Sequence, residues 1–240
     1  YGAIMKYIVL GLILFLAALT TLSAVITPLQ VIGPEQSKIL PPGPDKFCVY
    51  QDLLYLVDNS SGLVKVWNIS KNRIQKSDLI KLPPKMIISD ITRDDKNIYL
   101  LDSKNSKIMI YDKDGQKLRD ILTKGVPACA FKKAVRIQVN YQGIIYVLDQ
   151  GRGVILRFTS EGLFSGQASV PGAFSITIGT DQQLRVLQLQ QKRYYITVLG
   201  HALDTISITE INDIKYGKDD LVDLAVNDYG QFYFINGKKT

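Results

Sequence analysis

Short runs of alternating hydrophobic and polar residues dominate the chain from residue 47 onward. Between residues 135 and 163, for example, three such runs (135–139, 144–148 and 154–159) are separated by polar stretches that contain glycine. A period of two residues is typical of half-buried β-strands, and Asn, Asp, Ser and Gly between the runs favour tight turns. No unit of this region has a helical period. The pattern predicts short strands joined by turns.

These strands recur in units that share one short phrase. Tyr55–Asp58, Tyr99–Asp102 and Tyr146–Asp149 are plain copies, Arg185–Gln188 is a degenerate copy, and Tyr233–Asn236 begins a fifth unit. Successive copies begin 44, 47, 39 and 48 residues apart (55 to 99, 99 to 146, 146 to 185, 185 to 233). Periods of this size indicate stacked units, and units made only of strands indicate propeller blades. At roughly 45 residues each, about four and a half four-stranded antiparallel blades are predicted.

Two of the units resemble NHL repeats. Residues 143–162 (GIIYVLDQGRGVILRFTSEG) and 97–115 (NIYLLDSKNSKIMIYDKDG) both read as a strand, an Asp-containing turn, a strand and an acidic or Asp-Gly turn. The resemblance covers about residues 47–240. It implies an all-β, NHL-repeat-like propeller of the six-bladed type. The signatures of YWTD, WD and kelch repeats are absent.

The repeated acids and tyrosines have a structural interpretation. Each acid follows the second strand of its blade, where a carboxylate can accept backbone N–H bonds. Each tyrosine lies within a strand and is predicted to pack between blades with its hydroxyl at a polar edge. Calcium binding or catalysis by the acids is the alternative. The predicted structural repeat residues are Tyr55, Asp58, Tyr99, Asp102, Tyr146, Asp149 and Tyr233.

The N-terminal segment 1–26 is a separate element. Residues 7–26 contain no charge and no proline. Twenty helical residues rise about 30 Å, the thickness of the hydrocarbon core, so one transmembrane helix is predicted. A cleaved signal peptide is the other interpretation, but Leu22 stands where a small residue is needed. Lys6 precedes the helix, which predicts a cytoplasmic N-terminus in an inner or plasma membrane and a propeller in the periplasm or extracellular space.

Residues 27–46 have the composition of a linker. They include five prolines and two glycines, which favour extended, semi-rigid backbone that holds the propeller away from the bilayer. The domain that follows, 47–240, is expected to be an incomplete propeller. Because an open ring exposes strand edges, we expect the chain to continue beyond Thr240 or the linker or a partner to complete the sheet.

The net charge of +7 is unevenly distributed. Basic residues cluster in and after the second blade. Two interpretations fit: a solvated loop face, or a patch that attracts an acidic partner or anionic lipid headgroups. Exposed aromatic residues of the kind that stack on bases are not identified among them, so nucleic acid is not expected. The candidate interaction patch consists of Lys104, Lys107, Lys113, Lys117, Lys124, Lys132 and Lys133.

The sequence offers little for metal or covalent chemistry. His201 is the single histidine, and no Cys or His cluster has ligand spacing, so no metal, cofactor or catalytic residue is predicted. Cys48 and Cys129 form an even pair in a domain predicted to lie in an oxidising compartment. They are expected to form either a disulfide or two buried thiols.

These features together predict a non-catalytic, membrane-anchored β-propeller. Its role would be that of a protein-interaction or scaffold module, as an accessory subunit of a respiratory, photosynthetic, secretion or transport complex. The alternatives are an extracytoplasmic propeller enzyme (a lyase, a lactonase or a sugar-acting enzyme) and a sensor that binds glycans or other ligands.

Overall fold

A computed structural model describes residues 46–71, 73–211, 221–226 and 232–236. The predicted transmembrane segment 1–26 and all but the last residue of the predicted linker lie outside the described residues. The part of the chain that is described contains no helix long and apolar enough to cross a membrane.

The described chain is all-β, and four units are antiparallel four-stranded meanders, as predicted. The first blade contains β1 (Lys46–Tyr50), β2 (Leu53–Asp58), β3 (Leu63–Asn68) and β4 (Arg73–Lys81). The second contains β5 (Asp90–Arg93), β6 (Asn97–Asp102), β7 (Lys107–Asp112) and β8 (Lys117–Leu122). The third contains β9 (Ala134–Val139), β10 (Ile145–Asp149), β11 (Val154–Phe158) and β12 (Phe164–Ser169). The fourth contains β13 (Ala173–Ile178), β14 (Leu184–Gln190), β15 (Arg193–Leu199) and β16 (Thr205–Glu210), and β17 (Leu221–Val226) pairs with β18 (Phe232–Asn236) in a fifth unit.

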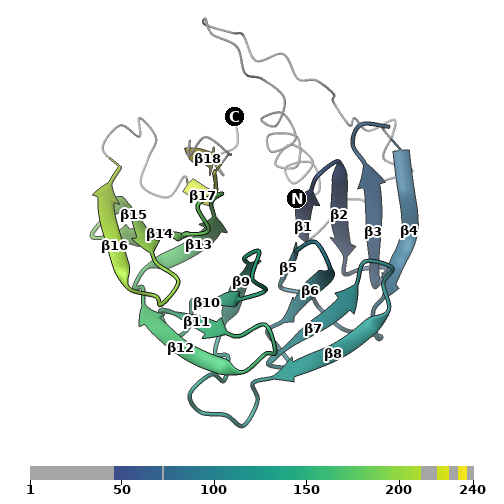
Figure 1. Ribbon diagram of the computed structural model, residues 1–240, viewed down its shortest axis with the longest axis horizontal. Coiled ribbons are helices and arrows are strands. Elements are labelled where there is room, and N and C mark those ends of the chain that lie inside the picture. Colours follow the sequence, from purple (N-terminus) through teal and green to yellow (C-terminus); the bar gives the residue numbers. More distant parts are fainter. Residues whose placement is uncertain (1–45, 72, 212–220, 227–231, 237–240) are drawn as a thin grey trace, which may run out of the picture.

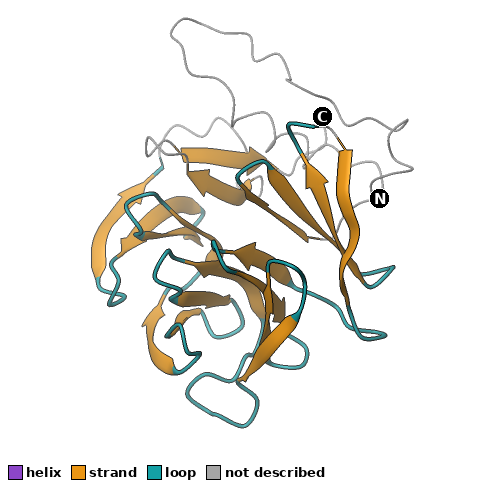
Figure 2. Cartoon of the chain, turned by 45° about the vertical axis from the view of Figure 1, so that its right-hand side comes forward, coloured by secondary structure: helices purple, strands orange, loops and turns teal. Residues whose placement is uncertain are grey.

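The blades stand side by side around one centre. The first strand of each unit lies innermost, where β1 contacts β5, β5 contacts β9, β9 contacts β13 and β13 contacts β17. The fourth strands β4, β8, β12 and β16 form the outer rim (Figures 1 and 2). This radial arrangement of meanders is the architecture of a β-propeller.

The meander gives the propeller two distinct faces. Because each blade has four antiparallel strands, the chain leaves a blade on the face where it entered. We call this the crossover face; it carries the β4–β5, β8–β9 and β12–β13 connections and the β2–β3, β6–β7, β10–β11 and β14–β15 turns. The remaining turns lie on the opposite side, which we call the hairpin face. Strand β1 begins on the crossover face at Lys46.

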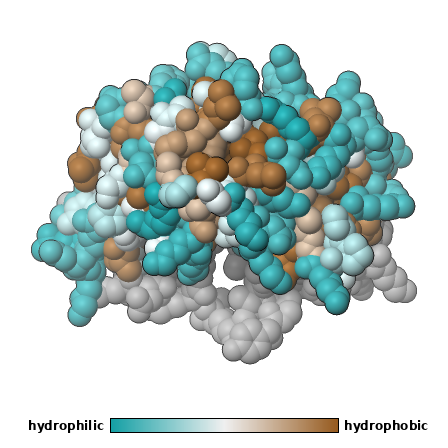
Figure 3. Space-filling model, turned by 90° about the horizontal axis from the view of Figure 1, so that it is seen from below, coloured by the Kyte–Doolittle hydropathy of each residue, from teal (hydrophilic) through white to brown (hydrophobic). Residues whose placement is uncertain are grey.

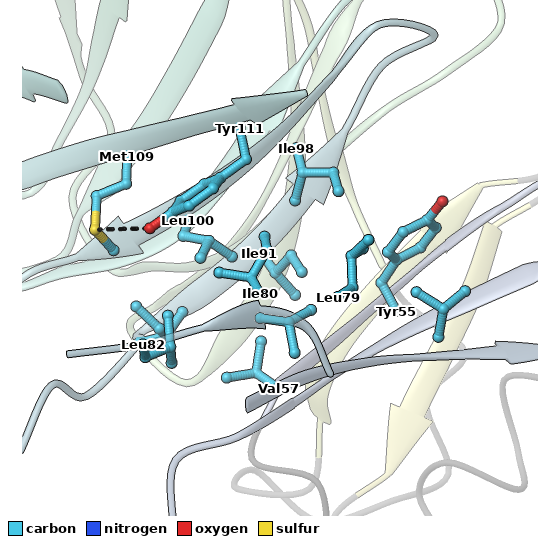
Figure 4. Packing of buried hydrophobic residues seen from close by; sticks show 13 residues of the cluster. Tyr55, Val57, Leu79, Ile80, Leu82, Ile91, Ile98, Leu100, Met109 and Tyr111 are labelled. Carbon is cyan, nitrogen blue, oxygen red and sulfur yellow. Dashed lines mark hydrogen bonds between the residues drawn. The ribbon is translucent and has the colours of Figure 1, made fainter. Parts of the chain in front are cut away.

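The hydrophobic core lies between neighbouring blades. Between the first two blades, aliphatic side chains of β2 and β4 pack against β5, β6 and β7, as Figure 4 shows for Val57, Ile80 and Leu100. Further clusters fill the interfaces between the second and third blades, the third and fourth, and the fourth and fifth. Full burial of one such side chain contributes about 1.5–3 kcal/mol, so these interfaces hold the blades in place.

Candidate functional site

The repeated acids of the first two blades cap their own turns. Asp58 accepts hydrogen bonds from the backbone N–H groups of Ser60 and Ser61 at 3.1 and 3.0 Å. Asp102 accepts them from the backbone and side-chain nitrogens of Asn105 at 3.0 and 2.7 Å. Burial raises the pKa of the Asp58 carboxyl, but hydrogen bonds to the turn outweigh burial and hold that pKa well below its usual range. These carboxylates are therefore committed to the backbone.

Asp149, the third acid, joins two blades. It accepts hydrogen bonds from the backbone N–H groups of Lys132 and Lys133 at 2.7 and 2.8 Å, and so fixes the β8–β9 loop against the β10–β11 turn. Arg152 of that turn donates to the carbonyls of Ala128 and Ala130 in the same loop at 3.1 and 3.3 Å. The described residues contain no group of three or more His, Cys, Asp and Glu that could hold a metal ion.

The repeated tyrosines lie in the interfaces between blades. Tyr55, Tyr99 and Tyr146 are at most 3% exposed and belong to the first, second and third of these interfaces. The Tyr99 hydroxyl donates to Asp94 at 2.8 Å, and burial raises the pKa of Tyr99 well above its usual range. Their hydroxyls therefore serve packing rather than acid–base chemistry. The Tyr233 side chain lies outside the described part of the chain.

The structure brings together a set of polar residues that the sequence did not single out. In every blade the second strand ends with the repeated acid, or with the Gln or Asn that replaces it. The residue just before that position pairs with a polar residue on the innermost strand. This residue lies 12 positions before the acid in the first two blades (46 to 58, 90 to 102) and 13 before it in the others (136 to 149, 175 to 188, 223 to 236). We call these residues the inner ring: Lys46, Asp90, Arg136, Ser175 and Asp223.

Members of the inner ring contact one another across the blades. Arg136 Nη2 lies 3.0 Å from Asp223 Oδ2, which links the third blade to the fifth. The Ser175 hydroxyl of the fourth blade donates to the same carboxylate. Asp90 accepts a hydrogen bond at 2.9 Å from the backbone N–H of Ile137 in the next blade. The ring thus ties together the inner strands of four blades near the crossover face.

Asp90 is the most perturbed acid of the inner ring. It is 6% exposed, and burial raises the pKa of its carboxyl to about 6. The positive charges of Arg136 and Lys46 act against burial, whereas the negative charge of Asp223 adds to it. This group changes charge near neutral pH beside two cations, so the ring combines hydrogen-bond donors with a titratable carboxyl.

The predicted basic patch is divided between the two faces. Lys113 and Lys117 lie at the β7–β8 turn on the hairpin face, where Lys117 pairs with Asp120 at 2.9 Å. The other members lie on the crossover face, on the β6–β7 turn and the β8–β9 loop. The sequence missed three exposed lysines that share this face, Lys81, Lys85 and Lys192, because they belong to other blades. Together with the remaining patch members, the crossover face carries Lys81, Lys85, Lys104, Lys107, Lys124, Lys132, Lys133 and Lys192.

Both cysteines are free thiols. Cys48 of β1 is half-buried against the core between the first two blades, whereas Cys129 is 3% exposed in the core between the second and third. The disulfide that the sequence allowed does not form in the structure. Burial raises the pKa of both thiols, which lowers their reactivity.

Three leucines are exposed on the rim of the second and third blades. Leu118 and Leu122 of β8 are 55% and 64% exposed, and Leu163, next to β12, is 67% exposed. The Arg119 side chain donates to carbonyls of the β11–β12 turn, so the two blades adjoin here. Figure 3, which views the rim from the side of β8 and β12, shows hydrophobic residues gathered near its middle. We call Leu118, Leu122 and Leu163 the rim patch.

No family model matches the sequence. A comparison with curated proteins finds no similar one. Solved structures are similar in fold. Virginiamycin B lyase from Staphylococcus aureus superimposes with a TM-score of 0.58 at 17% identity, over 80% of this chain and 63% of the lyase. Nidogen in complex with laminin gives 0.58 at 15% identity, over 80% and 70%. Hydrazine synthase from Kuenenia stuttgartiensis gives 0.57 at 14% identity, over 79% and 54%.

These similarities concern the fold alone. Identities of 14–17% carry no activity from one protein to the other, and the chain spans 63% of the length of the lyase. Their functions also differ, since the set includes a lyase, a hydrazine synthase and a component of a laminin complex. The described chain has the β-propeller fold that its repeats predict.

Proposed function

We propose that this protein is a non-catalytic, membrane-anchored β-propeller that acts as a protein-interaction or scaffold module. Its partner would be a larger respiratory, photosynthetic, secretion or transport complex of the membrane or envelope. The charge-free stretch 7–26 supports a single-pass anchor with the N-terminus in the cytoplasm and the propeller in the periplasm or extracellular space. NHL-like repeats support a propeller whose blades serve as a scaffold.

The observation that carries the proposal is the rim patch. Leu118, Leu122 and Leu163 expose more than half of their surface, although the aliphatic residues of the middle strands β6, β7 and β10 are buried. Large apolar side chains exposed along the rim of adjoining blades are available for contact with another protein. The underlying strand is fixed by Arg119 and by Ile121, which packs in the core between the blades, so the patch is presented on a rigid support.

Substitution of the rim patch tests this proposal. The triple variant Leu118→Ser, Leu122→Ser and Leu163→Ser is expressed as the full chain, extracted in mild detergent and compared with wild type by size and by identification of co-purifying proteins. The matched control is Ile206→Ser with Ile208→Ser, which removes exposed side chains from the rim of the fourth blade (51% and 64% exposed). Wild type and control should carry the same stoichiometric partner, and the triple variant should lose it. Equal retention in all three would refute this role of the patch.

The inner ring favours a second candidate, a propeller that binds or transforms a small ligand. Asp90 and Arg136 offer a titratable carboxyl and a guanidinium side by side. In one similar structure, a lyase is inactivated by replacement of a histidine with alanine. His201, the single histidine here, is exposed on the hairpin face, which supports the non-catalytic proposal. A small-molecule ligand that raises the melting temperature of wild type but not of Asp223→Asn would favour the second candidate.

A further inference from the structure

The two faces of the propeller differ in charge. On the crossover face, six exposed lysines form no ion pair with another described residue, and a seventh, Lys81 at the end of β4, pairs with Asp78 at 3.5 Å. The repeated acids of that face are buried and hydrogen-bonded to turns, as described above. Little exposed negative charge is therefore left to balance these six lysines: Lys85, Lys104, Lys124, Lys132, Lys133 and Lys192.

The hairpin face carries charges of both signs. Its turns hold most of the acids that are not committed to buried turns, together with several basic residues. The two faces therefore differ mainly in where the exposed acids lie, and no short window of the sequence shows this difference. The acids of the hairpin face are Asp52, Asp94, Asp95, Asp112, Asp114, Glu161, Asp181 and Asp204.

Two aliphatic side chains project among the lysines of the crossover face. Ile87 in the β4–β5 connection is 55% exposed, and Val126 in the β8–β9 loop is 45% exposed. Both loops are held in place: the Ile88 N–H donates to Asn59 at 2.8 Å, and the Thr123 N–H donates to the carbonyl of Ser106 at 2.9 Å. Exposed aliphatic residues flanked by lysines are the combination that binds the headgroup region of anionic membranes.

The chain also joins the propeller on this face. Strand β1 begins at Lys46 on the crossover face, so the segment that connects the propeller to the apolar stretch 7–26 arrives there. The intervening residues 27–45 could span at most about 65 Å when fully extended. The linker is therefore long enough to let the propeller either touch the bilayer or stand away from it. Attraction between the lysines and the headgroups would determine which of the two arrangements is populated.

We propose that the crossover face docks on anionic lipid headgroups of the bilayer in which the chain is anchored, with Ile87 and Val126 entering the interface. The inference rests on the proposed anchor and deepens it, because it assigns the face that the propeller turns to the membrane. The hairpin face then remains accessible to protein partners.

Hydrogen exchange on the full chain in nanodiscs tests this inference. Nanodiscs of neutral phosphatidylcholine are compared with nanodiscs that also contain phosphatidylglycerol. In anionic nanodiscs, amide exchange of residues 123–133 should slow severalfold relative to neutral ones, and exchange of the β7–β8 turn should not change. The difference should vanish in roughly 1 M salt, where the Debye length falls to about 3 Å.

Two triple variants make the test specific. Lys124→Gln, Lys132→Gln and Lys133→Gln remove charge from the crossover face and should abolish the protection. The matched control is Lys71→Gln, Lys96→Gln and Lys113→Gln on the hairpin face, which should keep the protection. Equal exchange in both lipids, or equal protection in both variants, would overturn the inference. So would protection of the loop by an acidic protein or a nucleic acid but not by anionic nanodiscs.

A separate readout distinguishes failure of the anchor from failure of the surface. Co-elution of the chain with neutral nanodiscs reports insertion independently of lipid charge. If the chain does not insert but still binds anionic vesicles through the crossover lysines, the docking surface stands and the anchor is refuted. If it inserts and shows no dependence on lipid charge, the docking surface is refuted and the anchor stands.

Discussion

Asp90→Asn should stabilise the propeller at neutral pH. Asp90 is 6% exposed at the start of β5 and faces Lys46 and Cys48 of β1, Arg136 of β9 and Asp223 of β17. Burial raises the pKa of its carboxyl from 3.8 to about 6, so ionisation of this group at neutral pH lowers the stability of the folded protein. Asparagine has nearly the same shape, carries no charge, and can still accept the hydrogen bond from the Ile137 N–H.

The magnitude follows from the pKa. One pKa unit corresponds to about 1.4 kcal/mol, so the difference between 3.8 and about 6 sets a ceiling of about 3 kcal/mol. Because the folded-state pKa is the higher one, the folded state binds the proton more tightly. Wild type should therefore lose stability as the pH rises from about 4 to about 6, and the loss should be complete above that. Asp90→Asn removes this loss.

Urea unfolding of the full chain in mild detergent measures the effect. Trp67 is the single tryptophan and is 1% exposed, so its fluorescence reports unfolding of the first blade. The free energy of unfolding is compared between about pH 4 and pH 7.5 for wild type, Asp90→Asn and the exposed control Asp114→Asn. The advantage of Asp90→Asn should be greatest at pH 7 and disappear near pH 4, while the control follows wild type.

The reasoning would be refuted by a variant that is less stable than wild type at pH 7. It would also be refuted by an Asp90→Asn profile parallel to that of wild type. The first result would mean that attraction to Lys46 and Arg136 outweighs the cost of burying the carboxylate, and the second would mean that attraction and burial cost balance.

Three further predictions concern turns and thiols. Gly115→Ala places a methyl group 2.0 Å from a β4 carbonyl oxygen, whereas Gly125→Ala meets nothing within 4 Å at a similar positive φ. Urea unfolding should show a loss of about 1–2 kcal/mol for Gly125→Ala and roughly 1–3 kcal/mol more for Gly115→Ala; equal losses would contradict the contact. Asp149→Ala leaves the N–H groups of Lys132 and Lys133 without their acceptor. The free energy of unfolding should fall by about 1–3 kcal/mol per group, and amide exchange at residues 123–133 should become faster. Unchanged exchange would contradict this prediction. In thiol labelling followed by mass spectrometry, the unfolded protein should take two labels without prior reduction, and the native protein should be labelled slowly at Cys129. A disulfide between Cys48 and Cys129 would contradict the structure.

Local features of the fold could be predicted from the sequence. Alternation of hydrophobic and polar residues predicts the strands. The hydrogen bonds of Asp58 and Asp102 join residues only two or three positions away, so strands and turns can both be predicted from short stretches of sequence. The degenerate fourth unit keeps its strands although Gln188 replaces the acid, because hydrophobic alternation rather than the acid specifies them.

The inner ring could not be predicted in the same way. Its members lie in five different blades, and only strand register shows that they are equivalent. Register shifts beside Arg136, Ser175 and Asp223 lengthen the spacing to the repeated position from 12 to 13 residues, which hides the repeat. Counting back 12 or 13 residues from each acid, with one register shift allowed, would have found the ring.

The predicted basic patch is divided between two faces for a related reason. Lys107 and Lys113 are six residues apart, but they stand at opposite ends of β7 and therefore on opposite faces. In a meander, closeness in sequence places charges together only within one turn. Conversely, lysines from different blades meet on the crossover face because each connection returns to it.

Gentle extraction from native membranes tests most directly whether this propeller is an anchored interaction module. The protein should resist release by alkaline carbonate, require detergent, and then migrate as a stoichiometric assembly well above the mass of its own polypeptide. A chain that carbonate releases and that runs alone as a monomer would contradict the proposed function.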